Sequence, residues 1–278
     1  WQDRSQVTGS FVEGALAFIK KAEGADRPFY VNVWPDDVHS PFFPPEDLRK
    51  PGGKHALYLG VLKAMDQQLA PLFDYVRNSE KLRDNTLILV CSDNGPEPGA
   101  GSAGPFRGGK TMLYEGGVRS PLIAWGPGLL ANDTVGSVNK ASVFSALDLA
   151  PSILAITGAS TPAETAFDGV ALPDVLLGKS KASRGLPLFF RRPPDRDSFD
   201  GIADLPDLAV RAGRWKLLCE YDGSDPQLYD LETDRSETDN VASAHPEIVA
   251  NLTRQLLAWH QALPADNGAT YRIPAAPR

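Results

Sequence analysis

Apolar residues along the first part of the chain follow two different spacings. Residues 8–24 and 55–79 carry apolar side chains at every third or fourth position, which predicts two amphipathic helices. The runs 29–34 and 86–91 are almost continuously apolar and rich in β-branched or aromatic residues, as buried strands are. A proline-rich loop, residues 35–51, separates the first strand from the second helix.

The same order of elements continues beyond residue 120. We expect a strand at 121–125 and a helix at 143–157 that ends at Gly158. Alternating helices and strands are typical of an α/β fold, and they predict a large, mostly parallel or mixed sheet sandwiched by helices.

The pattern changes after about residue 160. Short strands are predicted at 215–219 and 227–230, and a final helix at 246–263 has apolar residues at helical spacing. We therefore expect two parts: residues 1–160 as part of an α/β domain, and residues 161–278 with a small antiparallel sheet and a closing helix.

Composition excludes several classes of protein. The 278 residues are 42% hydrophobic and 23% charged, which is ordinary for a globular protein. The formal net charge of −7 argues against a nucleic-acid partner, since binding phosphate backbones needs clustered Lys and Arg. No apolar run is long enough to predict a membrane span. The chain opens on Trp1 without a signal peptide, which suggests a truncated or processed protein.

The two cysteines, Cys91 and Cys219, fit no zinc or redox motif. Both lie in apolar runs that predict strands. We expect two buried thiols in preference to one disulfide.

A first group of polar residues follows the predicted strand 86–91 directly: Ser92-Asp93-Asn94-Gly95. Ligands of open α/β sheets bind at the carboxyl ends of strands. Asp93 and Asn94 offer oxygen atoms suited to Ca²⁺ or Mg²⁺. A strand-capping turn is the alternative, because Asp-Asn-Gly is also strong turn sequence.

A second group of polar residues lies in the glycine-rich stretch 101–121. Arg107 and Lys110 supply positive charge where a tetrahedral oxyanion would sit, and the glycines allow the backbone to approach it. A nucleotide-binding phosphate loop is not expected here. For Lys110 alone, a solvated loop lysine is the alternative reading.

His39 lies just past the predicted strand 29–34, at the same sheet edge as Asp93. An imidazole there can hydrogen-bond an oxyanion or protonate a departing alkoxide. A surface histidine in a proline-rich loop is the alternative reading for His39 alone.

These segments together resemble the second half of a type I sulfatase, of the alkaline-phosphatase-like superfamily. The resemblance runs in order over nearly the whole chain. It begins with the run from Phe29 to Pro45 and with Ala64-Met-Asp-Gln-Gln-Leu69. It continues with Ser92-Asp-Asn-Gly95, Gly104-Pro-Phe-Arg-Gly-Gly-Lys110, Leu113-Tyr-Glu-Gly-Gly-Val-Arg-Ser-Pro-Leu122, Gly213-Arg-Trp-Lys-Leu-Leu218 and Leu228-Tyr-Asp-Leu231.

The resemblance implies a reaction and roles for these residues. Sulfatases of this type cleave sulfate esters with a formylglycine made from Cys or Ser in a C/S-x-P-x-R motif, beside a divalent cation that is usually calcium. Asp93 and Asn94 would then be metal ligands, with magnesium as the alternative ion. Lys110 would contact a sulfate oxygen, and His39 would contact sulfate or act as the leaving-group acid. Arg107 is a weaker candidate for substrate binding, or orients the loop.

The chain departs from the family pattern in one large respect. Neither Cys91 nor Cys219 lies in a formylglycine motif, and the upstream metal ligands are also missing. We therefore expect the nucleophile on an N-terminal partner sequence of the same protein, and no turnover from residues 1–278 alone.

Two alternatives remain open. One is a phosphodiesterase or phosphonate hydrolase of the same superfamily, which the presence of only four histidines disfavours. The other is a non-catalytic structural or binding module. For a sulfatase, the expected substrate is a sulfated carbohydrate or aryl alcohol, and family members are usually exported to the periplasm, the extracellular space or the lysosome. The residues do not name the particular substrate.

Overall fold

The computed structural model describes residues 4–161, 163–192 and 205–264, and the chain forms two compact units. The first unit comprises residues 1–102 and 121–183, and the second comprises residues 103–120 and 184–278. The short segment 103–120, which contains Arg107 and Lys110, therefore belongs with the C-terminal residues and not with its neighbours in sequence. The predicted boundary at residue 160 falls inside the first unit, and the division made there stays a prediction.

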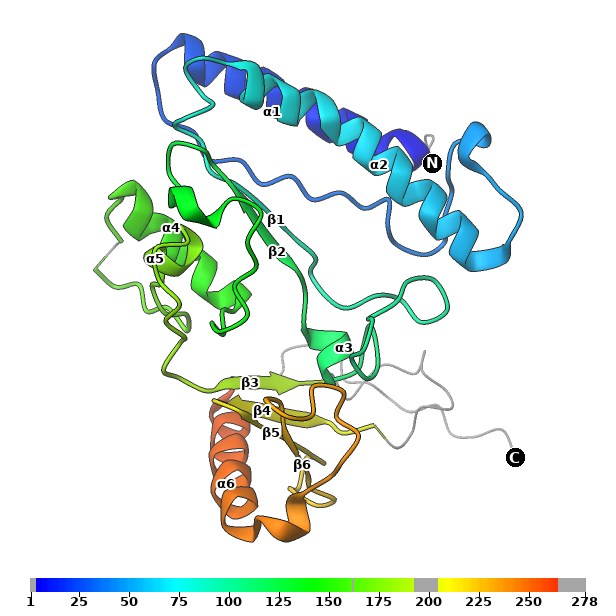
Figure 1. Ribbon diagram of the computed structural model, residues 1–278, viewed down its shortest axis with the longest axis vertical. Helices are drawn as coiled ribbons and strands as arrows, with labels where there is room; N and C mark the ends of the chain where they lie inside the picture. Colours follow the sequence, from blue (N-terminus) through cyan, green and yellow to red (C-terminus); the bar gives the residue numbers. More distant parts are fainter. Residues whose placement is uncertain (1–3, 162, 193–204, 265–278) are drawn as a thin grey trace. The chain divides into compact units, whose positions relative to one another are not determined.

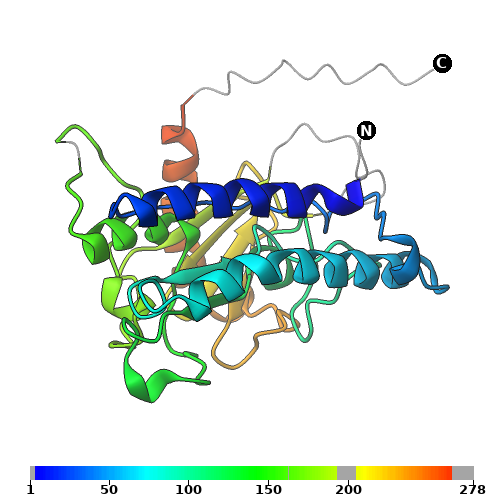
Figure 2. The same ribbon diagram turned by 90° about the horizontal axis from the view of Figure 1, so that it is seen from above.

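The first unit begins with two long helices that lie side by side (Figures 1 and 2). They run in the same direction, and their C-terminal ends meet where Glu23 accepts hydrogen bonds from Tyr75 Oη (2.5 Å) and Ser79 Oγ (3.1 Å). Val12 and Ile19 of the first helix and Val76 of the second are buried. The elements of this unit are η1 (Arg4–Gln6), α1 (Val7–Gly24), η2 (Glu46–Leu48), α2 (Gly53–Asn78), β1 (Ile88–Cys91), β2 (Leu122–Trp125), η3 (Asn132–Thr134), η4 (Ala146–Asp148), α4 (Leu149–Thr157) and α5 (Pro173–Leu176).

The strands of the first unit form a two-stranded antiparallel sheet, in which Val90 faces Ile123 and Cys91 faces Leu122. One end of this sheet packs against α1 and α2 through Ile88 and Trp125. The other end, which leads to Asp93, is exposed on both faces: Val90 (42%) and Ile123 (59%) lie on one face, and Leu122 (38%) lies on the other. The prediction of a fully buried strand with a buried Cys91 is therefore wrong. A strand is buried only where other segments cover its faces, and the apolar pattern of the strand itself does not show whether they do.

The prediction of a strand at 29–34 is also wrong. This segment has no strand pairing, although Phe29 and Val31 pack against the helices. Tyr30 is 63% and Trp34 is 78% exposed. Its β-branched and aromatic composition favours an extended backbone, but a strand also needs a neighbour with which to exchange hydrogen bonds.

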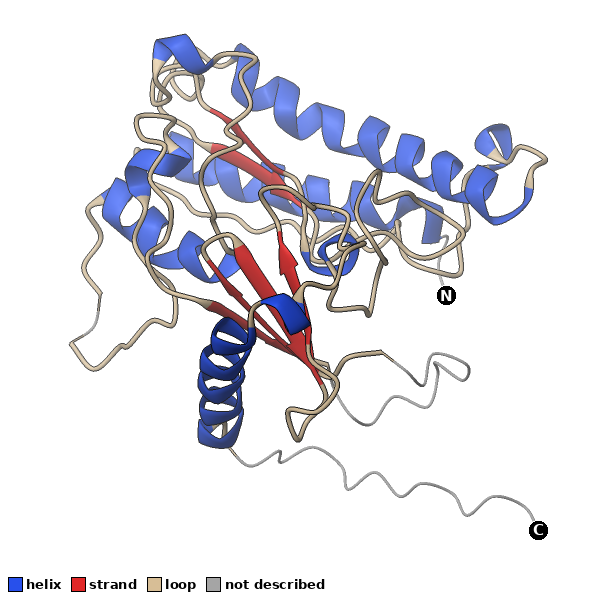
Figure 3. Ribbon diagram, turned by 60° about the horizontal axis from the view of Figure 1, so that its bottom comes forward, coloured by secondary structure: helices blue, strands red, loops and turns tan. Residues whose placement is uncertain are grey.

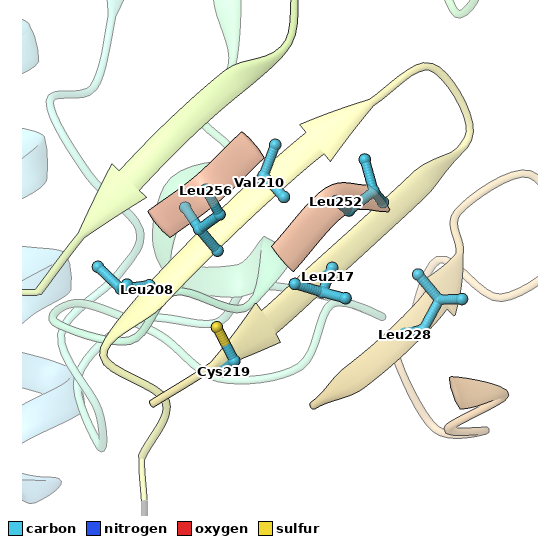
Figure 4. Close-up of a cluster of buried hydrophobic side chains, with 7 residues drawn as sticks. All are labelled: Leu208, Val210, Leu217, Cys219, Leu228, Leu252 and Leu256. Carbon is cyan, nitrogen blue, oxygen red and sulfur yellow. The ribbon is translucent and has the colours of Figure 1, made fainter. Parts of the chain in front are cut away.

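The second unit is built on a four-stranded antiparallel sheet in the order β3-β4-β5-β6. The alternation of side chains gives the sheet two buried faces. One face packs against α6 through Leu252 and Leu256, in a cluster of buried apolar side chains (Figures 3 and 4). The other face packs against the segment 103–120 through Leu113 and Tyr114. The elements of this unit are α3 (Glu115–Val118), β3 (Leu188–Arg191), β4 (Leu208–Ala212), β5 (Trp215–Cys219), β6 (Gln227–Asp230), η6 (Ala242–Ala244) and α6 (Pro246–Ala262).

Most sequence predictions for the elements are confirmed. The helices 8–24, 55–79 and 246–263, the strands 215–219 and 227–230, and the small antiparallel sheet with its closing helix all occur. The helix expected from 143 begins only at Leu149, because Ser145 and Asp148 form a capping box at the preceding turn. It ends at Gly158 as predicted, in the left-handed conformation.

The α/β class is confirmed as well, whereas no parallel pair occurs among the strands of the described ranges, so the mostly parallel or mixed sheet stays a prediction. Both cysteines are free thiols, and of the two only Cys219 is buried. Among the described helices, none is long and apolar enough to cross a membrane.

Candidate functional site

His39 lies in the proline-rich loop of the first unit, and the start of that unit holds the loop in place. Arg4 Nη2 donates to the carbonyl oxygens of Asp36 (3.1 Å) and His39 (3.2 Å) and to the Asp36 carboxylate. The hydroxyl of Thr8 donates to the buried Asp37. The imidazole itself is exposed, and its Nδ1 lies 2.7 Å from the carbonyl oxygen of Ser40. Because a carbonyl only accepts, Nδ1 carries the hydrogen and Nε2 remains available for chemistry.

Asp93 and Asn94 follow β1 directly, as the sequence predicts. Asp93 Oδ1 accepts from the backbone N–H of Asn94 (2.9 Å), and the Asn94 amide donates to the carbonyl of Gly95 (2.8 Å). That donation orients the amide, so its carbonyl oxygen is left as an acceptor. In the described part of the first unit, neither residue has a hydrogen bond or ion pair with His39.

Lys110 lies in the second unit, in a tightly folded loop that we call the glycine loop (residues 103–114). Gly108 has φ +79° and Thr111 has φ +80°, so Lys110 lies between two residues in the left-handed region. For a β-branched residue such as Thr111 this conformation is strained, by about 1–3 kcal/mol. Such a backbone persists only where the surrounding structure holds it.

The helix α3 provides that support. The backbone N–H of Gly116 donates to the carbonyl of Arg107 (2.8 Å), which fastens the helix to the loop. A Cβ on Gly116 would lie 2.4 Å from that same carbonyl oxygen, and one on Gly117 would lie 2.0 Å from the carbonyl oxygen of Met112. Only glycine allows the helix and the glycine loop to pack this closely.

Arg107 is engaged inside the second unit. Its Nη1 donates to the hydroxyl of Tyr229 (3.0 Å) and to the carbonyl of Glu237 (3.1 Å). Its guanidinium also lies 3.9 Å from the ring centroid of Tyr114. These contacts hold Arg107 between the glycine loop and the sheet, and the substrate-binding and loop-orienting roles expected from the sequence both stay predictions.

A buried ion cluster holds the glycine loop to the sheet, and the sequence predictions missed it. Lys216 is fully buried, and its Nζ lies 3.0 Å from Glu115 Oε1 and 2.9 Å from Glu237 Oε1. The second contact is an ion pair without well-aligned hydrogen-bond geometry. Glu237 Oε2 also accepts from the backbone N–H of Glu115 (2.6 Å). The one available signal was a lysine inside an apolar strand, Trp215-Lys-Leu-Leu-Cys219.

The two carboxylates of this cluster respond differently to burial. Burial opposes ionisation of Glu115, but Lys216, Arg211 and Arg119 outweigh it and hold the pKa of Glu115 below its ordinary value. Burial raises the pKa of Glu237, although the Lys216 ammonium favours its charged form. The negative charge of the cluster is therefore held more firmly on Glu115 than on Glu237.

Comparison with known proteins decides the family. Residues 5–159, more than half of the chain, match the sulfatase family model. The chain belongs to the sulfatase family. Residues 105–262 also match the model described as N-sulphoglucosamine sulphohydrolase, C-terminal. The two matches overlap in the stretch that contains Arg107 and Lys110.

Three sulfatase relatives illustrate the extent of the similarity. Arylsulfatase G of Rattus norvegicus is 28% identical over 95% of this chain and 54% of its own length. N-acetylgalactosamine-6-O-sulfatase of Bacteroides thetaiotaomicron is 28% identical over 92% of this chain and 51% of its own. A solved structure from work on the metabolism of multiple glycosaminoglycans by Bacteroides thetaiotaomicron superposes with a TM-score of 0.75, at 26% identity, over 94% of this chain and 55% of that one. This sulfatase chain thus spans about half the length of the relatives it matches.

The metal expected for a sulfatase fits the chemistry of two residues. Asp93 and Asn94 present the hard oxygen atoms that calcium prefers. Calcium takes about six to eight such ligands, and the described residues contain no group of three or more His, Cys, Asp or Glu side chains arranged to hold a metal. The two residues fit as part of a metal shell and not as the whole of one.

The glycine loop also carries the sequence spacing of a nucleotide-binding site. Residues from Gly104 to Thr111 do satisfy the spacing G-x-x-x-x-G-K-[ST] of a nucleotide phosphate loop, so spacing does not exclude that function. The fold does exclude it. A phosphate loop joins a strand to a helix that begins at the lysine, whereas turns and bends surround this loop and α3 begins only at Glu115.

Proposed function

We propose that the protein is a sulfuric ester hydrolase, and that this chain supplies His39, Lys110, Asp93 and Asn94 to its active site. The observation that carries the proposal is the sulfatase family match over residues 5–159, which contain all four. A sulfated saccharide is the favoured substrate, since the N-acetylgalactosamine-6-O-sulfatase relative is named for one. Export from the cytoplasm is part of the proposal, by analogy with the family.

Lys110 is proposed to contact an oxygen of the sulfate group. Its ammonium stabilises negative charge that develops on the sulfuryl oxygens during ester cleavage. The folded glycine loop supports this role, because a cation already held in position costs little reorganisation as the reaction proceeds.

His39 is proposed to act at the leaving oxygen. Because Nδ1 donates to the carbonyl of Ser40, the opposite nitrogen Nε2 is the ring atom that would act on the substrate. In the imidazolium form, Nε2–H can protonate the departing alkoxide or hydrogen-bond the sulfate.

Asp93 and Asn94 are proposed to contribute two oxygen ligands to a calcium ion, which would supply positive charge beside the sulfate. The formylglycine nucleophile implied by the family would come from N-terminal sequence of the same protein. We propose that this sequence also covers the exposed end of the β1–β2 sheet, where Val90 and Ile123 leave apolar surface in solvent.

The test uses the protein expressed from its native reading frame. Peptide mapping by mass spectrometry should find a formylglycine within a C/S-x-P-x-R motif. Hydrolysis of an aryl sulfate and of sulfated saccharides should be saturable and lost on chelation of calcium. We expect Lys110→Ala to lower kcat/KM by about 100-fold or more, the usual effect of removing one charge-stabilising donor.

Lys63→Ala is the matched control, because Lys63 is an exposed lysine on α2. It should retain wild-type kcat/KM. Equal activity of the two variants would remove Lys110 from the site. A protein that carries formylglycine but cleaves phosphodiesters in preference to sulfate esters would contradict the proposed function itself.

A further inference from the structure

The sheet of the second unit contains an unfavourable arrangement of charge on the face that packs against the glycine loop. Arg211 of β4 and Lys216 of β5 are direct cross-strand partners. Like charges in such positions repel each other. Lys216 is also fully buried, which makes an unpaired ammonium very costly.

The carboxylate of Glu115, from a distant part of the chain, offsets the repulsion between these two positive charges. It lies 101 residues before Lys216 in sequence, and its carboxylate bridges Lys216 (3.0 Å) and Arg211 (3.6 Å). Glu237 completes the ion cluster by binding both the Lys216 ammonium and the backbone N–H of Glu115. The first residue of α3 is therefore fixed by both its side chain and its backbone.

The position of α3 constrains the backbone position of Lys110. Gly116 and Gly117 pack directly on the backbone carbonyls of the glycine loop, with space for no side chain. The carbonyl of Arg107 accepts from Gly116, and the N–H of Met112 donates to the carbonyl of Gly109 (3.1 Å). Any shift of α3 must therefore move the backbone on both sides of Lys110.

Stability alone does not explain the ion cluster. Replacing a buried ion pair by neutral groups of similar shape is often neutral or stabilising, whereas such pairs can specify one geometry. Since this cluster joins the sheet to the loop of the candidate sulfate contact, the geometry it specifies is that of the loop.

We propose that Lys216, Glu115 and Glu237 are positioning residues that set the location of Lys110 for sulfate binding. This inference rests on the proposed sulfatase function. None of the three touches substrate, and each acts through the backbone of α3 and the glycine loop.

The test is a mutant cycle in the full protein from its native reading frame. The neutral variant combines Lys216→Met, Glu115→Gln and Glu237→Gln, which keeps the approximate shapes and neutralises the three fully buried charges, while Arg211 loses its carboxylate partner but stays partly exposed to solvent. We expect it to remain folded and to lose about 10- to 100-fold in kcat/KM, as a misplaced binding group does. In a Lys110→Ala background the same three changes should cause no further loss, because residues that act through one group are not additive.

A matched control removes another ion pair of the same sheet. Arg214, in the turn between β4 and β5, pairs with Asp230 at the end of β6, and the Arg214 side chain is 42% exposed. Arg214→Met with Asp230→Asn should leave kcat/KM within about twofold of wild type, as expected for a surface pair.

Each outcome decides between the claims. An equal loss from the neutral variant in both backgrounds would overturn the positioning role, because the cluster would then act on the enzyme as a whole. Absence of sulfate ester hydrolysis in the wild-type protein would instead refute the proposed function. If the neutral variant does not fold, Glu237→Gln alone keeps the Lys216–Glu115 pair. That variant should show a smaller loss that again disappears in the Lys110→Ala background.

Discussion

The two units of this sulfatase chain use similar apolar strands with opposite results. In the second unit, β5 lies inside a four-stranded sheet, and Leu217 and Leu218 on its two faces are fully buried. In the first unit, β1 pairs only with β2, and neighbouring side chains on both faces of that pair are exposed. An apolar run therefore indicates a strand, whereas its burial depends on what covers each face.

The difference lies in the number of covering layers. The second unit places α6 on one face of its sheet and the segment 103–120 on the other. The two-stranded sheet of the first unit is of a size that is marginal by itself in water. Its inner end, at Ile88 and Trp125, packs against α1 and α2.

The largest difference is expected in the reactivity of the two cysteines. Cys91 ends β1 and is exposed, whereas Cys219 ends β5 and is buried. Burial raises the pKa of the Cys219 thiol to about 12, so very little reactive thiolate exists at pH 8. Alkylation of the native chain with iodoacetamide, followed by mass spectrometry, should label Cys91 roughly a thousandfold faster. Equal labelling rates in the absence of denaturant would contradict the burial of β5.

A smaller difference is expected in the free energy of unfolding. Leu217→Ala removes a fully buried side chain and should cost about 2–5 kcal/mol. Ile123→Ala changes a side chain that is 59% exposed and should alter stability by no more than about 0.5 kcal/mol. Urea denaturation monitored by circular dichroism measures both. A large loss from Ile123→Ala in a longer form of the protein would show that additional sequence covers β2.

The smallest effect is expected in the pH dependence of the second unit. The pKa of Glu115 is held below its ordinary value of 4.5, so the stability it contributes is present above pH 4.5 and is lost as the pH falls through the lowered pKa. The raised pKa of Glu237 acts in the opposite direction, since stability increases as the pH falls from that raised value toward 4.5.

Unfolding curves measured at several pH values separate these two contributions. Glu115→Gln should lose less stability than wild type below pH 4.5. Glu237→Gln should lack the gain in stability that the wild type shows as the pH falls from the raised pKa of Glu237 toward 4.5. Parallel profiles for wild type and both variants would mean that the ion cluster does not titrate as the structure requires.

Much of the fold follows from the sequence in the second unit and less in the first. The period of Leu252 and Leu256 predicts α6 and its buried side, because a helix face needs only local spacing to be recognised. The segment 29–34 misleads, since its composition favours an extended backbone but cannot report a missing partner strand. The candidate site residues His39, Asp93, Asn94 and Lys110 were proposed from sequence motifs. Lys216 and Glu237 were missed, because a lysine inside an apolar strand is the one local signal and nothing in the chain shows which carboxylate it meets.

The sequence by itself determined the family and the main helices, and it supplied the residues of the proposed site. These depend on local spacing and on short motifs, which survive without knowledge of the fold. Only the tertiary structure decided that the segment 103–120 belongs to the C-terminal sheet, and that Glu115 meets Lys216 across 101 residues. Burial and charge pairing depend on segments that lie far apart in the sequence and meet only in the folded chain. The residue pattern of one segment therefore does not predict them.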